Sequence, residues 1–309
     1  MDSDSLFYLK NQFYLGNFKY LSDNPLPAQS EPSYLSTLCY TVRSRIALKD
    51  YSGALSLLPP SNTSEPVRAL RALVNYLQAA PGQKDSALEE LRDLCLEVEE
   101  DGADSETEEG AGAGLVKVVA ATAFVNENEL EEALTTLGAG CKSRDIECVA
   151  LIVHIYLSIA RTDLAKKEYD AAKKWADDSL LIQMIEATIG LTVGSSTLQT
   201  ARYIYDEQAS APGSSTNPSI LTAKGISQIL LGKFSDADNS LNEALAIDAT
   251  YGEALEAKAV VAELRGRKLD AETAFSRLTS ADHPLARDLE EKSSAFDAAA
   301  AKFAVSSAA

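Results

Sequence analysis

Residues 218–251 read PSILTAKGISQILLGKFSDADNSLNEALAIDATY, and this stretch decides the fold. Ala237 is followed four positions later by Leu241, which places a small and a large apolar side chain on one helix face. The small residue lets a neighbouring helix come close, and the large one fills the space beside it. Gly232 interrupts the stretch, and glycine tolerates the left-handed conformation with which helices often end. These 34 residues therefore predict two packed helices joined by a tight corner.

The same small residue recurs along the whole chain at nearly constant spacing. The seven alanines are Ala54, Ala87, Ala133, Ala165, Ala201, Ala237 and Ala271, separated by 33, 46, 32, 36, 36 and 34 residues. The large residues that follow them at the fourth position are Leu58, Leu91, Leu137, Tyr169, Tyr205, Leu241 and Phe275. A repeat of about 34 residues is typical of tetratricopeptide (TPR) helix pairs. We therefore expect an all-α, TPR-like solenoid of about eight helix pairs.

The position equivalent to Gly232 in each repeat predicts a corner, the tight turn between the two helices of a pair. The predicted corner residues are Gly16, Lys49, Gly82, Asn128, Ala160, Ser196, Gly232 and Gly266. In the first repeat Leu21 and Pro25 replace the small and the large residue, as is common in terminal repeats that cap a stack. We expect a single solenoid domain over residues 1–309.

Two segments depart from the repeat. Residues 97–114 hold eight carboxylates followed by alternating glycine and alanine, a composition that predicts a solvated loop insertion. Residues 285–304 predict a final helix with an apolar face made by Leu285, Leu289, Phe296 and Phe303. We expect this helix to cap the exposed edge of the array.

Composition excludes several classes of function. The chain carries 46 acidic and 28 basic residues, a net charge of −18, whereas nucleic acids and anionic lipids are bound mainly through Lys and Arg. We therefore expect no nucleic-acid partner and only indirect membrane association. Four cysteines without a C-x-x-C pair and only two histidines predict no metal site, no cofactor and no catalytic residue. The acidic residues 1–5 are unlike a secretory leader and predict a cytoplasmic protein.

A solenoid of TPR pairs builds a curved surface that holds another protein. The first helix of each pair lines its inside, at positions 13, 10, 6 and 3 residues before the corner. The predicted partner-binding residues are Leu6, Lys10, Phe13, Cys39, Arg43, Ile46, Ala69, Ala72, Tyr76, Leu115, Val118, Val125, Ala150, His154 and Leu157. Most of them are apolar or aromatic, as a permanent interface requires. Lys10 and Arg43 stand alone, unlike the paired cations with which chaperone-binding TPR proteins grip a carboxylate.

Several sequence blocks go beyond the general TPR pattern. They are LFYLKNQFYLG at 6–16, IECVAL at 146–151, RTDLAKKE at 161–168, TLQTARYIY at 197–205, HP at 283–284 and KSSAFD at 292–297. In their order these blocks resemble the coatomer epsilon subunit family over nearly the whole chain. The acidic insertion at 97–114 is the main departure from that family.

The resemblance implies a non-enzymatic structural subunit of the COPI vesicle coat, peripheral on Golgi membranes and COPI-coated vesicles. In that family the TPR array curls into a bracelet around the C-terminal domain of the alpha coatomer subunit. The resemblance thus implies a heterodimer within the heptameric coat that supports Golgi-to-ER retrograde and intra-Golgi transport. A generic TPR adaptor or co-chaperone scaffold, and an enzyme carrying a TPR scaffold, are the alternative interpretations.

Overall fold

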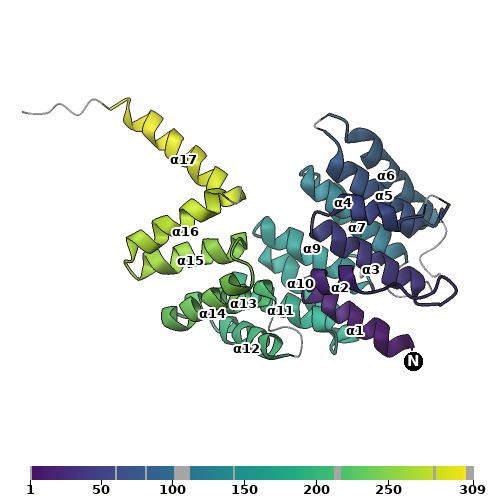
Figure 1. The fold of residues 1–309 in the computed structure, drawn as a ribbon, viewed down its shortest axis with the longest axis horizontal. Coiled ribbons are helices and arrows are strands. Elements are labelled where there is room, and N and C mark those ends of the chain that lie inside the picture. The colour runs from purple at the N-terminus through teal and green to yellow at the C-terminus, as the bar shows by residue number, and fades with distance from the viewer. Residues whose placement is uncertain are drawn as a thin grey trace, which may run out of the picture. The chain divides into compact units, whose positions relative to one another are not determined.

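The computed structural model describes residues 2–59, 61–80, 82–100, 112–141, 143–211, 217–280 and 283–303. These residues form seventeen α-helices and no strand (Figure 1), which confirms the predicted all-α class. The chain divides into two compact units, Met1–Thr197 and Leu198–Ala309. A single solenoid over the whole chain, and its curling into a bracelet, stay predictions.

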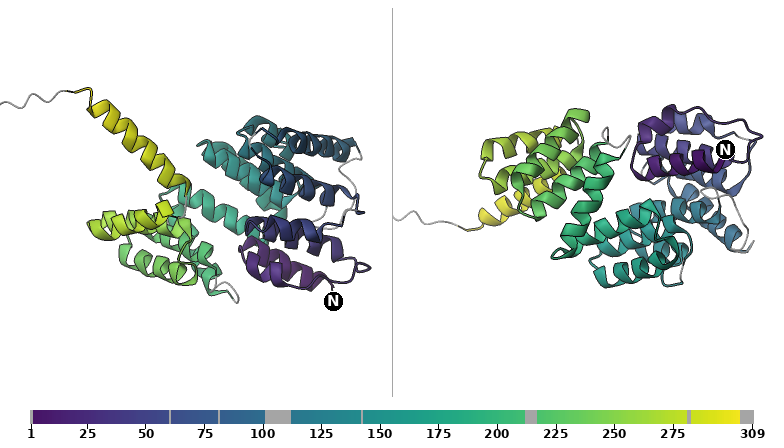
Figure 2. Two further views of the ribbon diagram at one scale, coloured as in Figure 1. Left: turned by 45° about the horizontal axis from the view of Figure 1, so that its top comes forward. Right: turned by 90° about the horizontal axis from the view of Figure 1, so that it is seen from below.

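The first unit is built from helices that pack pairwise along the chain. Its helices are α1 (Asp2–Tyr14), α2 (Phe18–Asp23), α3 (Tyr34–Ala47), α4 (Tyr51–Leu57), α5 (Glu65–Gln78), α6 (Asp85–Glu100), α7 (Ala113–Asn126), α8 (Leu130–Leu137), α9 (Ile146–Ser158), α10 (Thr162–Ala176) and α11 (Leu180–Val193). Each first helix also packs against the first helix of the next pair, as α5 does on α7 and α7 on α9. Figure 2 shows these helices side by side.

The second unit repeats the arrangement. Its helices are α12 (Thr197–Ser210), α13 (Pro218–Leu230), α14 (Phe234–Ile247), α15 (Gly252–Leu264), α16 (Lys268–Ser280) and α17 (Pro284–Ala300). The stretch 218–251 forms the pair α13–α14, as predicted. An ion pair of 3.2 Å between Asp206 and Lys224 joins α12 to α13.

The repeating alanines are the points of closest packing, as the sequence predicts. All seven are buried, and so are the large residues that follow them, except for the half-buried Phe275. Gly225 on α13 shows how tight this contact is, because a Cβ atom added there would lie 2.9 Å from Leu241 Cγ on α14. No larger side chain fits between these two helices without displacing one of them.

Seven of the eight predicted corners are confirmed. Gly16, Lys49, Gly82, Asn128, Ala160, Gly232 and Gly266 all adopt positive φ angles. The prediction of Ser196 is wrong, because the positive φ angles in that connection belong to Gly194 and Ser195. Gly194 directly follows α11 as its C-cap, so the glycine ends this helix before the predicted position is reached.

The acidic insertion begins later than predicted. Glu97 and Glu99 belong to α6, which continues to Glu100, and residues 101–111 lie outside the described part of the chain. The helix continues because its other face, which includes Val98, is buried in the core. Glu97 also pairs with Arg68 at 2.7 Å across to α5. Apolar packing and this ion pair keep the carboxylates helical.

The final helix forms but ends at Ala300, before the predicted end at residue 304, so Phe303 lies beyond it. Its apolar face is not covered. None of the described residues of α17 is buried, and Phe296 and Phe303 are 72 and 78 % exposed. Figures 1 and 2 show that only the beginning of α17 lies against the α15–α16 pair. At that point the His283 ring packs on Gly252, where an added Cβ would lie 2.3 Å from the ring. The described residues of the second unit therefore leave the apolar face of α17 accessible, and the capping of the array by this helix stays a prediction.

The corner at Ala160 provides a test of the repeat geometry. After α9, the Ala160 N–H donates to Leu157 O at 3.0 Å and the Arg161 N–H donates to Tyr156 O at 2.7 Å, a helix ending that favours glycine. Because alanine is strained at positive φ, Ala160→Gly is expected to raise the free energy of unfolding by about 1 kcal/mol. Urea denaturation measures this change.

The matched control is Ala171→Gly in the interior of α10. There the same substitution is expected to lower the free energy of unfolding by about 1 kcal/mol, because glycine is a poor helix former. Destabilisation of the same size by both variants would contradict a left-handed conformation at Ala160.

Candidate partner-binding surface

The described side chains show little that resembles catalytic chemistry. No group of three or more His, Cys, Asp or Glu residues in the described ranges could hold a metal ion. All four cysteines are free, and three are buried. Burial raises the pKa of the Cys95 thiol to about 11, so this thiol is protonated and unreactive at neutral pH. Across the described ranges, no helix has both the length and the apolar character needed to span a bilayer.

The fifteen predicted partner-binding residues divide into a buried and an accessible group. The buried residues are Cys39, Ala69, Ala72, Tyr76, Leu115 and Val118. The half-buried residues are Leu6, Lys10, Phe13, Arg43, Ile46, Val125, Ala150 and Leu157, and His154 is exposed. The buried group lies on α3, α5 and α7, which pack side by side and fill the inner face between them. These six side chains are core and not open surface, and the partner-binding role of the set stays a prediction.

Helices α1, α3 and α9 meet at a buried carboxylate. Glu147 Oε2 pairs with Arg43 Nη2 at 2.6 Å, and these two side chains are only 11 and 13 % exposed. Glu147 Oε1 accepts hydrogen bonds from the phenols of Tyr14 and Tyr40, both at 3.0 Å. The Arg43 guanidinium lies 4.4 Å from the centroid of the Phe13 ring, which adds a cation–π attraction. Three first helices are therefore tied together by one side chain; we call these five residues the Glu147 cluster.

The Glu147 cluster keeps its charges at neutral pH. Burial alone would raise the pKa of the Glu147 carboxyl, but the Arg43 guanidinium and the two phenol hydrogen bonds outweigh burial and hold that pKa below its usual range. Burial and the adjacent Glu147 charge raise the pKa values of Tyr14 and Tyr40 well above those of exposed tyrosines. Both phenols therefore remain hydrogen-bond donors to the carboxylate.

Glu147 is missing from the predicted set although its position carries a signal. It lies 13 residues before the corner at Ala160, which is an inner position of the repeat. A carboxylate at an inner position of the apolar block 146–151 needs a buried cation. Arg43, at an inner position of another repeat, was available for that role. The sequence around neither residue predicts this pairing, because the two side chains meet only when α3 and α9 pack together.

Aromatic side chains remain exposed at the start of the first unit. Phe7 and Tyr8 on α1 and Tyr20 on α2 all keep large exposed areas. The rings of Tyr8 and Tyr20 meet edge to face, with centroids 6.2 Å apart. Exposed aromatic clusters are typical of protein–protein contacts. The predicted partner-binding set contains inner positions only and therefore omits these three residues, although two of them lie in the aromatic block 6–16.

Helix pairs joined at left-handed corners, with one buried alanine in each, define a TPR-like helical repeat protein. A tetratricopeptide repeat protein from Parabacteroides merdae has the same kind of fold, with a TM-score of 0.56 over 82 % of this chain and 95 % of its own, at 12 % identity. Residues 2–304 match the family model of the coatomer epsilon subunit, and the chain belongs to this family. It is therefore a non-enzymatic subunit of the COPI coat that associates with other coat subunits.

Relatives match over nearly the full length of the chain. Coatomer subunit epsilon-1 of Arabidopsis thaliana is 29 % identical over 304 residues, covering 97 % of this chain and 98 % of the relative. Coatomer subunit epsilon-2 of Oryza sativa subsp. japonica is 28 % identical over 305 residues, covering 96 % of both chains. The family that the sequence blocks indicate is confirmed.

The Glu147 cluster predicts a large effect of a conservative change. Glu147→Gln leaves the Arg43 cation buried without its counter-ion, and we expect it to lower the free energy of unfolding by about 3 to 5 kcal/mol. The double variant Arg43→Met/Glu147→Leu, which removes both charges, should recover most of this loss. Chemical denaturation followed by circular dichroism measures both.

The exposed pair between Arg161 and Asp163, at 2.8 Å, supplies the control. Asp163→Asn should leave the unfolding midpoint nearly unchanged, because exposed ion pairs contribute little. Equal effects of Asp163→Asn and Glu147→Gln would contradict the central role of the buried carboxylate.

The lowered pKa of Glu147 also predicts a pH dependence. Because the folded pKa lies below the unfolded value, which is about 4.3, the contribution of Glu147 is complete above that value and is lost as the pH falls through the folded pKa. The difference in unfolding free energy between the wild type and Glu147→Gln should therefore be constant from about pH 7 to pH 5 and shrink below about pH 4.

Burial raises the pKa of the neighbouring Asp145, so its contribution has the opposite sign and is lost as the pH rises. Asp145 is present in both proteins, but the Glu147 charge contributes to its raised pKa. The difference therefore reports Glu147 together with its effect on Asp145, and the loss at low pH belongs to Glu147. Denaturation curves at a series of pH values provide the measurement, and a difference that does not change with pH would contradict the assignment.

Proposed function

We propose that this coat subunit binds and stabilises the C-terminal domain of the alpha coatomer subunit and thereby supports Golgi-to-ER retrograde and intra-Golgi vesicle transport. The observation that carries the proposal is the match of residues 2–304 to the coatomer epsilon family. The subunit would lie in the cytoplasm, peripheral on Golgi membranes and COPI-coated vesicles. Other coat subunits would make the membrane contact, because a net charge of −18 disfavours binding to anionic lipid.

The accessible inner positions of the first unit are the part of the array that we assign to this partner. On α9, Ala150, His154 and Leu157 follow Glu147 at steps of three and four residues and so share one helix face. On α1, Leu6 and Lys10 occupy the corresponding inner positions. The Glu147 cluster holds α1 and α9 in a fixed relation within this unit, so both faces are available as one pre-organised surface.

The surroundings of Arg43 and Lys10, the two cations at inner positions, favour the coat role over a co-chaperone role. Arg43 is paired with the buried Glu147 and cannot serve a partner carboxylate. The Lys10 amine lies 5.9 Å from the centroid of the Tyr14 ring. A carboxylate clamp needs two or more converging cations, and these positions do not provide them.

Co-expression of the full chain with the alpha C-terminal domain, followed by gel filtration, tests the proposal. The wild type should co-elute with the alpha domain. Ala150→Glu/His154→Glu should weaken binding by at least about tenfold, because two carboxylates then have to be desolvated in an apolar contact. His154 is exposed and Ala150 is only half-buried at the edge of the core, so the helical circular dichroism should be retained.

Ser56→Glu/Thr135→Glu is the matched control. It adds two carboxylates at exposed positions on α4 and α8, the second helices of their pairs. This control should co-elute as the wild type does. A wild-type chain that elutes without the alpha domain would overturn the proposed function, and equal loss in both variants would overturn the assigned surface.

A further inference from the structure

A basic corner joins α15 to α16 in a strongly acidic chain. Three of the four residues at 265–268 are basic, whereas only 28 of all 309 residues are. The helix before this corner presents the acidic inner positions Glu253, Glu256 and Glu263 and one lysine, Lys258, so the basic corner lies beside mostly acidic surface. A cluster of basic residues in a chain of negative net charge calls for a structural or functional explanation.

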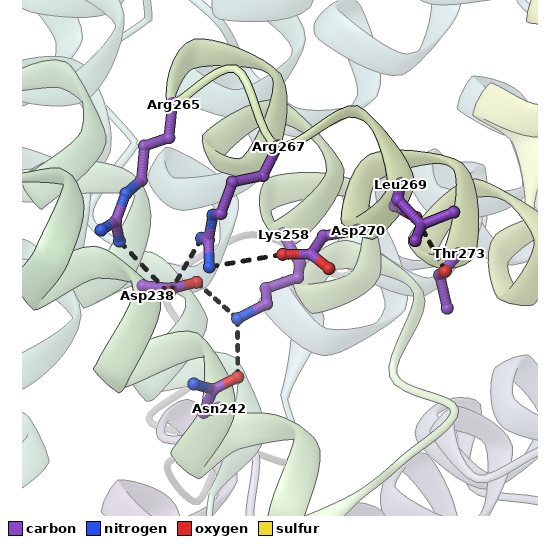
Figure 3. Close-up of polar contacts among 8 residues, drawn as sticks. All are labelled: Asp238, Asn242, Lys258, Arg265, Arg267, Leu269, Asp270 and Thr273. Atoms are coloured by element: carbon purple, nitrogen blue, oxygen red, sulfur yellow. Dashed lines mark hydrogen bonds and ion pairs between the residues drawn. The ribbon is translucent and has the colours of Figure 1, made fainter.

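Asp238 of α14 organises the corner, as Figure 3 shows. Its carboxylate accepts a hydrogen bond from Lys258, and it pairs with Arg265 at 3.3 Å and with Arg267 at 2.9 Å. Lys258 also donates to Asn242 Oδ1 at 2.7 Å. The Asp238 side chain is only 14 % exposed and lies beneath the cations. Three basic side chains are therefore held in place around one carboxylate.

Asp238 remains ionised in this setting. Burial alone would raise the pKa of its carboxyl, but hydrogen bonds from Lys258 and Arg267 outweigh burial and lower that pKa. The carboxylate is thus a permanent anchor at neutral pH. It neutralises only one of the three cations that surround it.

The cations of the corner outnumber the carboxylates that form ion pairs with them. Arg267 has a second, longer pair with Asp270 at 3.4 Å. Lys268 is exposed and has no ion-pair partner among the described residues. Among the described residues, Lys258, Arg265 and Arg267 form ion pairs with Asp238 and Asp270, so three paired cations and the unpaired Lys268 share two paired carboxylates. Glu263 and Glu272, which the structure also describes, lie nearby in the sequence but form no ion pair with these cations. The side chains of Arg265 and Arg267 are each about a third exposed, so the surplus charge is accessible.

Exposed leucines border the basic residues on both sides. Leu264 ends α15 and Leu269 lies in the first turn of α16, and they are 56 and 75 % exposed. The basic corner, which we define as Leu264, Arg265, Arg267, Lys268 and Leu269, therefore combines cationic and apolar surface. A simple anion would use only the cations, whereas a peptide with acidic and apolar side chains would use both.

The net charge of the chain decides between possible anionic partners. Nucleic acids and anionic bilayers present extended negative charge, which a chain of net charge −18 repels at long range. A short acidic segment brings its charge to the corner alone. Within the Debye length of about 8 Å at physiological salt, the local surplus then dominates.

We propose that the basic corner binds a short acidic segment of a partner protein that carries an apolar side chain beside its carboxylates. This interaction goes beyond the proposed binding of the alpha subunit and uses a different part of the chain. Arginine and lysine would pair with the segment's carboxylates, and Leu264 and Leu269 would cover its apolar side chain. Asp238 acts as the positioning residue that holds the arginines in place.

Fluorescence anisotropy with the full chain tests the proposal. The probe is a fluorescein-labelled twelve-residue peptide of glutamates with two central leucines, and the comparison peptide contains glutamates only. The wild type should bind the leucine-containing probe more tightly, and binding should weaken between 50 and 300 mM NaCl, values that span about a twofold change in Debye length. Arg265→Glu/Lys268→Glu should weaken binding of the probe by about tenfold or more.

Lys166→Glu/Lys167→Glu is the matched control, because it makes the same charge change at two exposed positions of α10. It should retain nearly wild-type affinity for the probe. Leu264→Ser/Leu269→Ser should weaken binding of the leucine-containing probe and leave binding of the glutamate-only peptide unchanged. Neutral Arg265→Gln/Lys268→Gln removes the two charges without adding repulsion and should also weaken binding of the probe.

Several results would overturn the proposal. These are absence of probe binding by the wild type, equal losses in the Arg265/Lys268 and Lys166/Lys167 variants, and binding to phosphatidylserine vesicles in place of the peptide. The variants should remain folded, because the pairs of Lys258 and Arg267 with Asp238 are left intact. Thermal unfolding checks this. The assay contains no alpha subunit, so its result is independent of the proposed function.

Discussion

Close approach of paired helices at one small residue is the constraint on which the array depends. Each second helix after the first pair presents a buried alanine to its neighbour. The space left between α13 and α14 is so small that an added Cβ at Gly225 would lie 2.9 Å from Leu241 Cγ. Short, left-handed corners keep the two helices of a pair in this register. Because one pair alone leaves an apolar face exposed, stacking on the next pair completes each core.

The buried carboxylate of Glu147 adds long-range order to this local scheme in the first unit. One buried carboxylate with three hydrogen-bonding partners ties α1, α3 and α9 together, and it would lose a partner if α1 or α3 moved away. Buried ion pairs add little net stability, but an unpaired partner is costly. The Glu147 cluster therefore fixes which helices meet.

The sequence predicts well what is decided within one repeat. The alanines, seven of the eight corners and the α13–α14 pair follow from short-range spacing, and all appear in the structure. It predicts less well what is decided between repeats. Tyr76 and Leu115 occupy inner positions, yet neighbouring helices cover them. The apolar face of α17 is clear from its pattern, but the pattern does not say whether anything packs on it. Helix periodicity reveals which side of its own helix a residue occupies and not what lies opposite that side.

Two carboxylates in this chain show how charge balance separates a structural ion pair from a docking surface. Glu147 meets one cation and two phenols, is nearly fully buried, and leaves no net charge. Asp238 meets three cations whose side chains are 18 to 35 % exposed, and a further lysine follows along the chain. Holding two helices together requires only one of those cations, and each additional one is repelled by the others. Cations that are held in place but not neutralised lower their energy by meeting an anion from outside. The surplus around Asp238 therefore favours recognition, whereas the balance around Glu147 favours structure.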